Sequence, residues 1–136
     1  MEVNKQEITG DILTFYIKAE TFPEGIDDTF KKLGELINGF DGREAYGVSG
    51  CFDGALIYRA CVKEQYPGEA QKYNLPYYII PKGKYLCTIL KDWREHLPEI
   101  NQIFHQLMEN LNTVKGSICL EYYKNEEEAL LMVQGN

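Results

Sequence analysis

The sequence predicts an α+β fold made of two β-α-β-β repeats, in which one antiparallel sheet carries two long helices on the same face. Two amphipathic helical segments, near 25–39 and 97–112, each follow one β-rich stretch and precede two more. The two helical segments also resemble each other, and the chain of 136 residues is close to the commonest size of one domain. We therefore expect a single domain over 1–136, with repeat one at about 8–63, a connector at about 64–75 and repeat two at about 76–134.

The first repeat begins with a stretch rich in Ile, Thr, Phe and Tyr over residues 8–20, which is typical of a strand. A helix follows because Asp27 and Asp28 complement the dipole at its start, and Gly39 permits a left-handed end. Two strand-like runs, "AYGVSGCF" and "ALIYRACVK", then flank Asp53-Gly54, a strong signal for a hairpin. The apolar residues at helical spacing are Ile26, Phe30, Leu33, Leu36 and Ile37.

The second repeat follows the polar, turn-rich segment 64–75, which we interpret as a connector. Its first strand region, "PYYIIPKGKYLCTIL", is interrupted by Pro81-Lys82-Gly83. Pro98 suits the first turn of the second helix, and "SICLEYY" and "ALLMVQ" predict the last two strands. The apolar stripe of this helix is Ile100, Ile103, Phe104, Leu107, Met108 and Leu111.

The two helical segments align without a gap. The aligned pairs are Phe30/Phe104, Leu33/Leu107, Glu35/Glu109 and Asn38/Asn112. Together with the repeated order of elements, the alignment indicates an internal duplication with pseudo-twofold symmetry. A cleft where the two repeats meet is a natural ligand site.

Charge and hydropathy exclude several classes of function. The net charge of −7 and the acidic run Glu126-Glu127-Glu128 argue against nucleic-acid binding. No apolar run approaches the roughly 20 residues that a membrane span needs, and the N-terminal residues do not form a signal peptide. We therefore expect a cytoplasmic protein with neither a nucleic-acid nor a membrane partner.

Cysteine and histidine spacing predicts neither a metal site nor a cofactor. The four cysteines form no CxxC pair, and their apolar surroundings favour buried free thiols. A Cys–His dyad stays open, although no feature supports it. His96 and His105 both fall in the second helical segment, away from the strands, so we rank haem binding low. No nucleophile motif or phosphate-binding loop is present.

One carboxylate stands out. In "ICLEYY", residues 118–123, the strand alternation puts Glu121 on one face between a thiol and a phenol, with Leu120 on the other face. From the residues alone, a solvent-facing glutamate and a functional one are equally good interpretations. Arg59, a charge within an apolar strand, is most simply outward or ion-paired, and a carboxylate partner near the cleft stays open.

The chain resembles the GyrI-like effector-binding domains. In the second half, "IPKGKY", an amphipathic helix and "ICLEYY" carry the resemblance; in the first half, "FPEGIDDTFKKLGELI", "AYGVSG" and "IYRACV" do. It covers about residues 8–134. The family includes ligand-sensing domains of multidrug-responsive transcription regulators, free-standing small proteins, a gyrase-inhibitory protein and some hydrolases of strained electrophiles. Its fold is the duplicated β-α-β-β arrangement.

The resemblance implies that Glu121 is an acidic pocket residue that faces a cationic, hydrophobic small molecule between aromatic rings. A lipophilic cation would relieve the cost of burying an unpaired carboxylate, and aromatic faces would add cation–π attraction. Since tyrosine suits pocket walls and the chain has ten, the aromatic candidates beside Glu121 are Trp93, Tyr46, Tyr58, Tyr85 and Tyr123.

The regulators of this family carry a helix-turn-helix domain in front, whereas only a few residues precede the first strand here. We therefore expect no direct DNA binding, and a regulatory role would need a protein partner such as a regulator or gyrase. The alternative is a small hydrolase of electrophilic molecules. In that case Glu121, its pKa raised by burial, is the general base, and Tyr or Trp donors stabilise an oxyanion.

Overall fold

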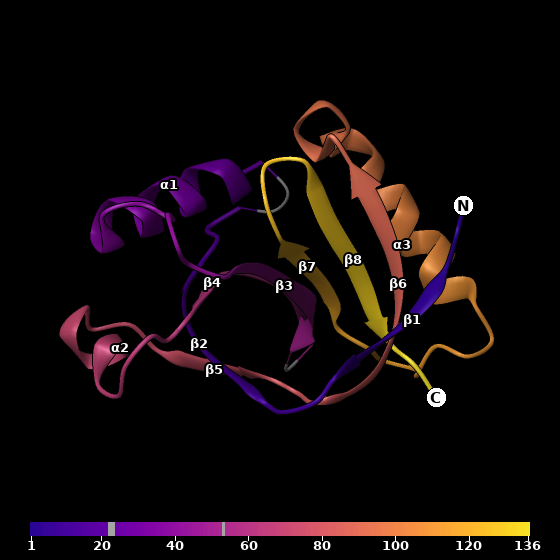
Figure 1. Cartoon of the computed structure of the whole chain (residues 1–136), viewed down its shortest axis with the longest axis horizontal. Coiled ribbons are helices and arrows are strands. Elements are labelled where there is room, and N and C mark those ends of the chain that lie inside the picture. Colours follow the sequence, from indigo (N-terminus) through magenta and orange to yellow (C-terminus); the bar gives the residue numbers. More distant parts are fainter. Residues whose placement is uncertain (22–23, 53) are drawn as a thin grey trace.

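The computed structural model describes residues 1–21, 24–52 and 54–136, where the chain forms an α+β fold with one strongly curled sheet of eight strands (Figure 1). The strands are β1 (Asn4–Ile8), β2 (Ile12–Lys18), β3 (Ala45–Phe52), β4 (Ala55–Lys63), β5 (Tyr77–Ile80), β6 (Gly83–Lys91), β7 (Cys119–Tyr123) and β8 (Glu128–Gln134). The helices are α1 (Ile26–Ile37), α2 (Glu69–Lys72) and α3 (Ile100–Glu109), with the 3-10 turns η1 (Trp93–Glu95) and η2 (Leu97–Glu99).

The strand order across the sheet is β1-β6-β8-β7-β3-β4-β2-β5, and every neighbouring pair is antiparallel. Strands β3 and β7 form the centre. The edge strands pair far along the chain, because β1 lies beside β6 and β5 lies beside β2. The sheet therefore joins both halves of the sequence at its centre and at its edges.

Both long helices pack on one face of the sheet. Residues opposite each other in an antiparallel pair share a face, and the row Ala60, Gly47, Glu121, Leu131 crosses the sheet in this way. Ala60 belongs to the core cluster that contains Leu33 of α1, and Leu131 belongs to the cluster with α3 residues. The row therefore runs beneath both helices, with Glu121 near its middle.

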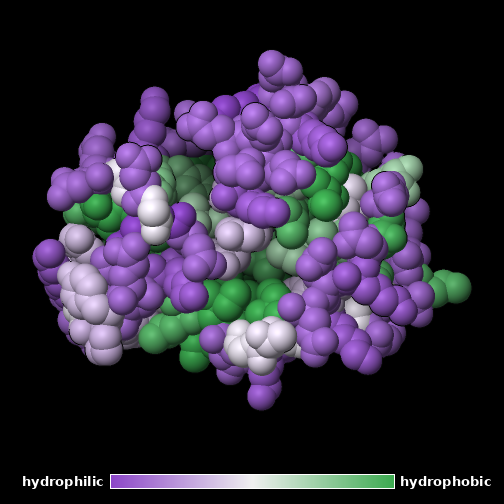
Figure 2. All heavy atoms as spheres, viewed as in Figure 1, coloured by the Kyte–Doolittle hydropathy of each residue, from purple (hydrophilic) through white to green (hydrophobic). Residues whose placement is uncertain are grey.

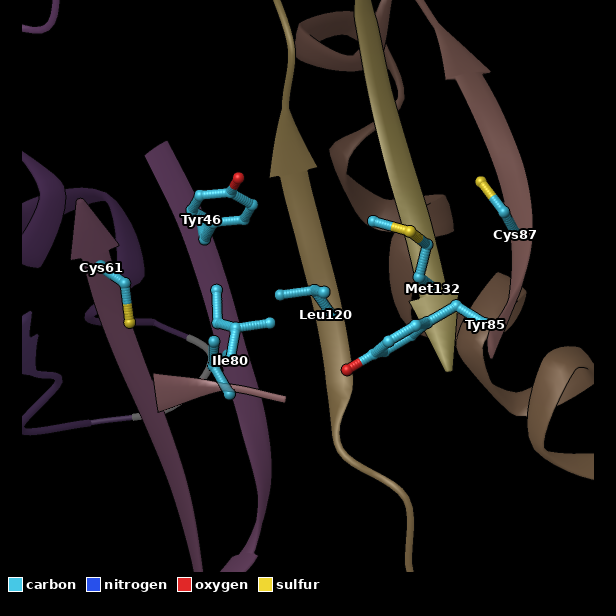
Figure 3. Packing of buried hydrophobic residues seen from close by; sticks show 8 residues of the cluster. Tyr46, Cys61, Ile80, Tyr85, Cys87, Leu120 and Met132 are labelled. Atoms are coloured by element: carbon cyan, nitrogen blue, oxygen red, sulfur yellow. The ribbon is translucent and has the colours of Figure 1, made fainter. Parts of the chain in front are cut away.

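The opposite face of the sheet curls around its own side chains. Ile80 of the edge strand β5 shares a cluster with Leu120 of the central strand β7 and with Tyr85 and Cys87 of β6 (Figure 3). In a flat sheet these strands would be too far apart to share one core. In the view of Figure 1, Figure 2 shows polar side chains over most of the visible surface, with hydrophobic ones gathered at the lower centre and to the right of the upper centre.

Helix α1 forms where the periodicity predicts it. Thr29, Leu33 and Ile37 are its buried residues, at helical spacing. The helix ends at Ile37, because Asn38 (φ 61°) and Gly39 (φ 94°) both turn left-handed, and the Gly39 N–H donates to the Gly34 carbonyl at 2.8 Å.

Helix α3 is shorter than the segment predicted at 97–112. Pro98 lies in the 3-10 turn η2 that precedes the helix. The helix stops at Glu109 because Asn110 is extended and the Thr113 hydroxyl donates to the Leu107 carbonyl at 2.6 Å. The apolar stripe is shorter too, since Leu111 is 97% exposed.

The connector contains one helical turn, α2, which its polar, turn-rich composition did not predict. Turn α2 is held from outside: Glu69 is buried, accepts the Gln65 N–H at 2.9 Å and pairs with Arg43 at 2.8 Å. A single turn has too little periodicity to reveal itself. Strands β3 and β4 pair as the predicted hairpin, whose Asp53 lies outside the described residues.

The β-rich region predicted over 8–20 contains the strand β2, and a further strand, β1, lies before it and ends at Ile8. β1 and β2 are separated at Gly10 and Asp11, and the Asp11 carboxylate accepts the Lys82 N–H at 2.9 Å. No helix in the described part of the chain is long and apolar enough to cross a membrane.

Candidate functional site

Glu121 lies under the helices, near the middle of the sheet. It sits in β7 between Gly47 of β3 and Leu131 of β8, and only 6% of its surface is exposed. Leu120 points to the opposite face and is fully buried. The alternation predicted in "ICLEYY" is therefore present, and the glutamate does not face solvent.

Two phenols donate hydrogen bonds to the same oxygen of this carboxyl group. The Tyr58 hydroxyl lies 2.7 Å from Glu121 Oε1, and the Tyr123 hydroxyl lies 2.5 Å from it. These two hydrogen bonds therefore converge on one oxygen of the carboxyl group.

Gly47 makes room for this arrangement. A Cβ atom at Gly47 would lie 2.1 Å from Tyr58 Oη and 2.5 Å from Glu121 Oε1, closer than packed atoms approach. The carboxyl group and the phenol therefore rest directly on the backbone of β3. Any side chain at this position would push both groups away.

Aromatic rings surround the carboxyl group. Phe30, from α1, makes edge contacts with Tyr58 and Tyr123 at centroid distances of 6.3 and 5.8 Å. Trp93, from η1, lies 4.7 Å from the ring of Tyr123. The rings thus come from α1, β4, η1 and β7.

Trp93 is tied to the turn between β7 and β8. Its indole N–H donates to the Asn125 carbonyl at 2.9 Å, and the neighbouring Asp92 N–H donates to the Glu127 carbonyl. The Arg94 guanidinium lies 4.6 Å from the Trp93 ring. The ring beside Tyr123 is therefore anchored to the hairpin that carries Glu121.

Burial dominates the electrostatics. Loss of water raises the pKa of Glu121, and the hydrogen bonds from Tyr123 and Tyr58 offset only part of that rise. Burial and the nearby carboxyl group together raise the pKa of each tyrosine well above its usual value. Among the described residues no ion pair to Glu121 is present, so no positive charge there offsets the effect of burial on its pKa.

The structure brings four of the predicted site residues together and separates two. Glu121, Tyr58, Tyr123 and Trp93 form one contact group. Tyr46 and Tyr85 lie on the opposite face of the sheet, so their expected place beside Glu121 was wrong.

The two separated tyrosines belong to the inner core. Tyr46 stacks on Tyr122 at 4.9 Å and donates to the Glu44 carboxylate at 3.0 Å. The Tyr85 hydroxyl donates to the Pro81 carbonyl at 2.7 Å. Their side chains point away because Tyr46 precedes Gly47 by one residue and Tyr85 precedes the helix-facing Leu86 by one.

Arg59 also lies on the opposite face. It pairs in register with Val48, and its guanidinium lies 5.0 Å from the Tyr16 ring and 5.1 Å from the Tyr78 ring. A role as the partner of Glu121 is therefore incompatible with its position.

Phe30 and Gly47 were absent from the predicted site. Phe30 appeared in the sequence as one member of a helical stripe, and Gly47 appeared as an ordinary strand residue. Pairing "AYGVSG" with "ICLEYY" in register would have placed Gly47 opposite Glu121, which is the signal that could have identified it.

The three cysteine thiols that the structure describes are shielded from solvent in whole or in part. Cys61 and Cys87 are free and buried, and Cys119 is free and partly buried. Burial raises the pKa of Cys119 to about 11, so this thiol beside Glu121 stays protonated at neutral pH. Within the described residues, no cluster of three His, Cys, Asp or Glu side chains could hold a metal ion.

Two surface hollows open away from Glu121. One of about 380 Å³ is lined by Gly42, Glu44, Lys63, Glu64 and Gln65. The other, of about 340 Å³, is lined by Met1, Glu2, Asn4, Thr88 and Ile89. Neither hollow is lined by Glu121 or by the rings of Phe30, Tyr58, Trp93 and Tyr123.

No family model and no curated protein sequence matches this chain. Solved structures do. An integron cassette protein from the mobile metagenome of Vibrio cholerae has a TM-score of 0.68 at 16% identity, covering 98% of this chain and 95% of its own. SAV2435, solved bound to tetraphenylphosphonium, has a TM-score of 0.68 at 15% identity, covering 100% and 94%.

A third structure, a candidate bacterial transcription regulation protein from Staphylococcus aureus MU50, has a TM-score of 0.61 at 17% identity and covers 99% of both chains. At identities this low, the likeness concerns the fold alone. The chain has the fold that these three proteins share.

Proposed function

We propose that this chain is a GyrI-like effector-binding domain that captures small, hydrophobic cations at Glu121. The observation that carries the proposal is a buried carboxyl group with no cationic partner among the described residues, enclosed by Phe30, Tyr58, Trp93 and Tyr123. A hydrophobic cation supplies the missing charge, and its apolar groups suit the rings.

The energetics favour a cation over a neutral molecule of the same shape. Two unit charges about 5 Å apart attract by roughly 3 kcal/mol at an effective dielectric constant of about 20. Each well-placed ring adds about 0.5–2 kcal/mol of cation–π attraction. The solved complex of SAV2435 with tetraphenylphosphonium supports this ligand class through the shared fold.

The proposal includes a duplicated domain with its ligand cleft at the junction of the repeats. In the strand order, β3-β4-β2-β5 mirrors β7-β8-β6-β1 about the centre of the sheet, which supports two β-α-β-β units related by a pseudo-twofold axis. Glu121 on β7 and Gly47 on β3 are paired across that centre. Binding would require the rings of Phe30 and Trp93 to part from Tyr123.

A thermal-shift measurement with tetraphenylphosphonium tests the proposal. At a concentration 100-fold above its dissociation constant, the cation should stabilise the protein by about 2.7 kcal/mol. Triphenylphosphine oxide, a neutral molecule with similar rings, should stabilise it much less. Equal shifts by both molecules, or an undiminished shift in Glu121→Gln, would refute a cation site at Glu121.

A regulatory or sequestering role through a protein partner also belongs to the proposal. The candidate transcription regulator among the structural neighbours supports such a role. Affinity capture on the immobilised chain, with and without tetraphenylphosphonium, tests for a partner such as a regulator or gyrase. A ligand that changes no captured protein would contradict ligand-controlled regulation.

A small hydrolase is the second candidate, favoured by the raised pKa of Glu121, which suits a general base. The hydrogen bonds at the site make the hydrolase a weaker candidate than the binding protein. Tyr58 and Tyr123 already donate to Glu121, and the Trp93 indole donates to the Asn125 carbonyl, so the expected oxyanion donors are engaged. Turnover of activated cyclopropanone or ester substrates that disappears in Glu121→Gln would favour the enzyme, and binding without product would exclude it.

A further inference from the structure

The hydrogen bonds at Glu121 treat its two oxygens differently. Oε1 accepts both phenolic hydroxyls, at 2.7 and 2.5 Å, as the carbonyl oxygen of a neutral carboxylic acid can. Both of these hydrogen bonds end on Oε1, so a proton on Oε2 leaves them intact.

Among the described residues, the groups that shift the pKa of Glu121 include no positive charge. β4 contributes the Tyr58 hydroxyl, and β7 contributes the Tyr123 hydroxyl and the Cys119 thiol, each of which is neutral. Neither Gly47 of β3 nor Leu131 of β8 is ionisable.

The elements that pack over this part of the sheet contribute mainly aromatic side chains. α1 contributes the ring of Phe30, α3 packs Phe104 against the neighbouring β8 cluster, and η1 contributes Trp93. The Arg94 guanidinium lies against the outer partner of Tyr123, the Trp93 ring, but it is 63% exposed and within 4.0 Å of Glu126. Solvent and Glu126 screen this charge from the carboxyl group.

From this geometry we propose that Glu121 is a cation–proton exchange site: the free protein holds a proton on Oε2, and an entering cation displaces that proton to solvent. The inference rests on the proposed function, since it specifies how the same carboxyl group becomes charged. The balance is one neutral acid plus one cation giving one carboxylate–cation pair plus one released proton. The raised pKa of Glu121 agrees with it.

Exchange has a consequence for affinity. The cation binds only the ionised form, so its apparent affinity scales with the ionised fraction of Glu121 in the free protein. The apparent dissociation constant therefore falls about tenfold per unit rise in pH until Glu121 is ionised, and then levels off. Binding is tightest at pH values above the pKa of Glu121, where the carboxylate of the free protein is already ionised.

Calorimetric titration with tetraphenylphosphonium tests the exchange. Titrations in buffers of different ionisation enthalpy, from mildly acidic to mildly alkaline pH, count the protons released per cation bound. We expect the count to approach one at the acidic end and to vanish at the alkaline end. Binding with no proton release and a constant dissociation constant across the series would overturn the exchange while leaving the cation site in place.

Three substitutions test whether the released proton comes from Glu121. Glu121→Gln keeps the shape and the acceptor oxygen, and should abolish proton release. Tyr123→Phe removes a donor that stabilises the carboxylate, so proton release should extend to higher pH. Tyr46→Phe, on the opposite face, should match the unsubstituted protein, and an equal change in Tyr46→Phe would contradict the assignment to Glu121.

Infrared spectra of the ligand-free protein separate this inference from the proposed function. The difference between the spectra of the unsubstituted protein and Glu121→Gln reports the C=O stretch of a protonated carboxyl group. Its presence at mildly acidic pH and its loss at alkaline pH are expected. Its absence throughout would overturn the exchange, whether or not tetraphenylphosphonium binds, whereas failure of the cation to bind would overturn the function.

Discussion

Glu121 makes the stability of the fold depend on pH. Because burial raises its pKa above the value in the unfolded chain, the native state holds the proton more tightly. The stability associated with this proton is fully present below the unfolded-state pKa and is lost as pH rises through the folded-state pKa.

Glu121→Gln should remove that dependence. The free energy of unfolding of the variant, minus that of the unsubstituted protein, should grow as pH rises across this window. Urea unfolding at a series of pH values measures it, with the exposed Glu127→Gln as the control. A difference that stays constant with pH would contradict the buried, protonated state of Glu121.

Gly47 provides a second test at the scale of single residues. Gly47→Ala places a methyl group 2.1 Å from Tyr58 Oη, so overpacking should lower the free energy of unfolding by about 1–3 kcal/mol. Gly10→Ala is the matched control, because a Cβ there meets no atom within 4 Å, and its effect should stay within about 0.5 kcal/mol. Denaturant unfolding of both variants compares them, and equal effects would refute the close packing over β3.

The sheet face of some site residues could be predicted from the sequence, whereas that of others could not. Glu121 and Tyr123 lie two residues apart in one strand, so their shared face could be predicted from the local sequence "ICLEYY" alone. Tyr46 and Tyr85 could not be assigned correctly, because their face relative to Glu121 depends on how β3, β6, β7 and β8 pair. A shift of one residue in that register moves every side chain to the other face.

At the scale of elements, α3 shows that a residue in the predicted apolar stripe need not be buried. Leu107 is fully buried beneath the helix, whereas Leu111, from the same predicted stripe, lies beyond the helix end and is 97% exposed. Leu107→Ala should lower the free energy of unfolding by about 2–5 kcal/mol, and Leu111→Ala should change it by less than about 0.5 kcal/mol. Thermal or urea unfolding distinguishes them, and similar losses would mean that the helix continues past Glu109.

The 3-10 turn η1 offers an optical test of ligand entry. Trp93 is the only tryptophan of the chain, and its ring lies 4.7 Å from Tyr123. Since a ligand must separate these rings to reach Glu121, tetraphenylphosphonium should change the tryptophan emission with the same midpoint as calorimetric binding. Calorimetric binding with unchanged emission would place the ligand elsewhere on the protein.

The elements differ in how far local sequence determined them. α1 carries its own capping and periodic signals, and it forms within two residues of the predicted ends. The turn α2 depends on the ion pair between Glu69 and Arg43, which are distant in sequence, and the end of α3 depends on the hydroxyl of Thr113. Contacts of this kind belong to the folded chain and have no periodic trace in the sequence.

At the scale of the whole molecule, the strand order explains why the site forms only in the complete fold. Tyr58 belongs to the first half of the chain, Glu121, Tyr123 and Trp93 to the second, and the central pairing of β3 with β7 joins them. The edge strands β1 and β5 each pair with the other half of the chain, which ties the two halves together at both ends of the sheet. The predicted order of elements was sufficient for the fold class, but the pairing that creates the site depends on long-range register.

The measurement that tests the central claim most directly is calorimetric titration of tetraphenylphosphonium and of neutral triphenylphosphine oxide into the unsubstituted protein and Glu121→Gln. The cation should bind the unsubstituted protein one to one, more tightly than the neutral molecule by at least about tenfold, which corresponds to 1.4 kcal/mol or more of charge-dependent free energy. In Glu121→Gln this preference should disappear. Equal affinity for both molecules in the unsubstituted protein, or a preference that survives the substitution, would contradict a cation-binding function for Glu121.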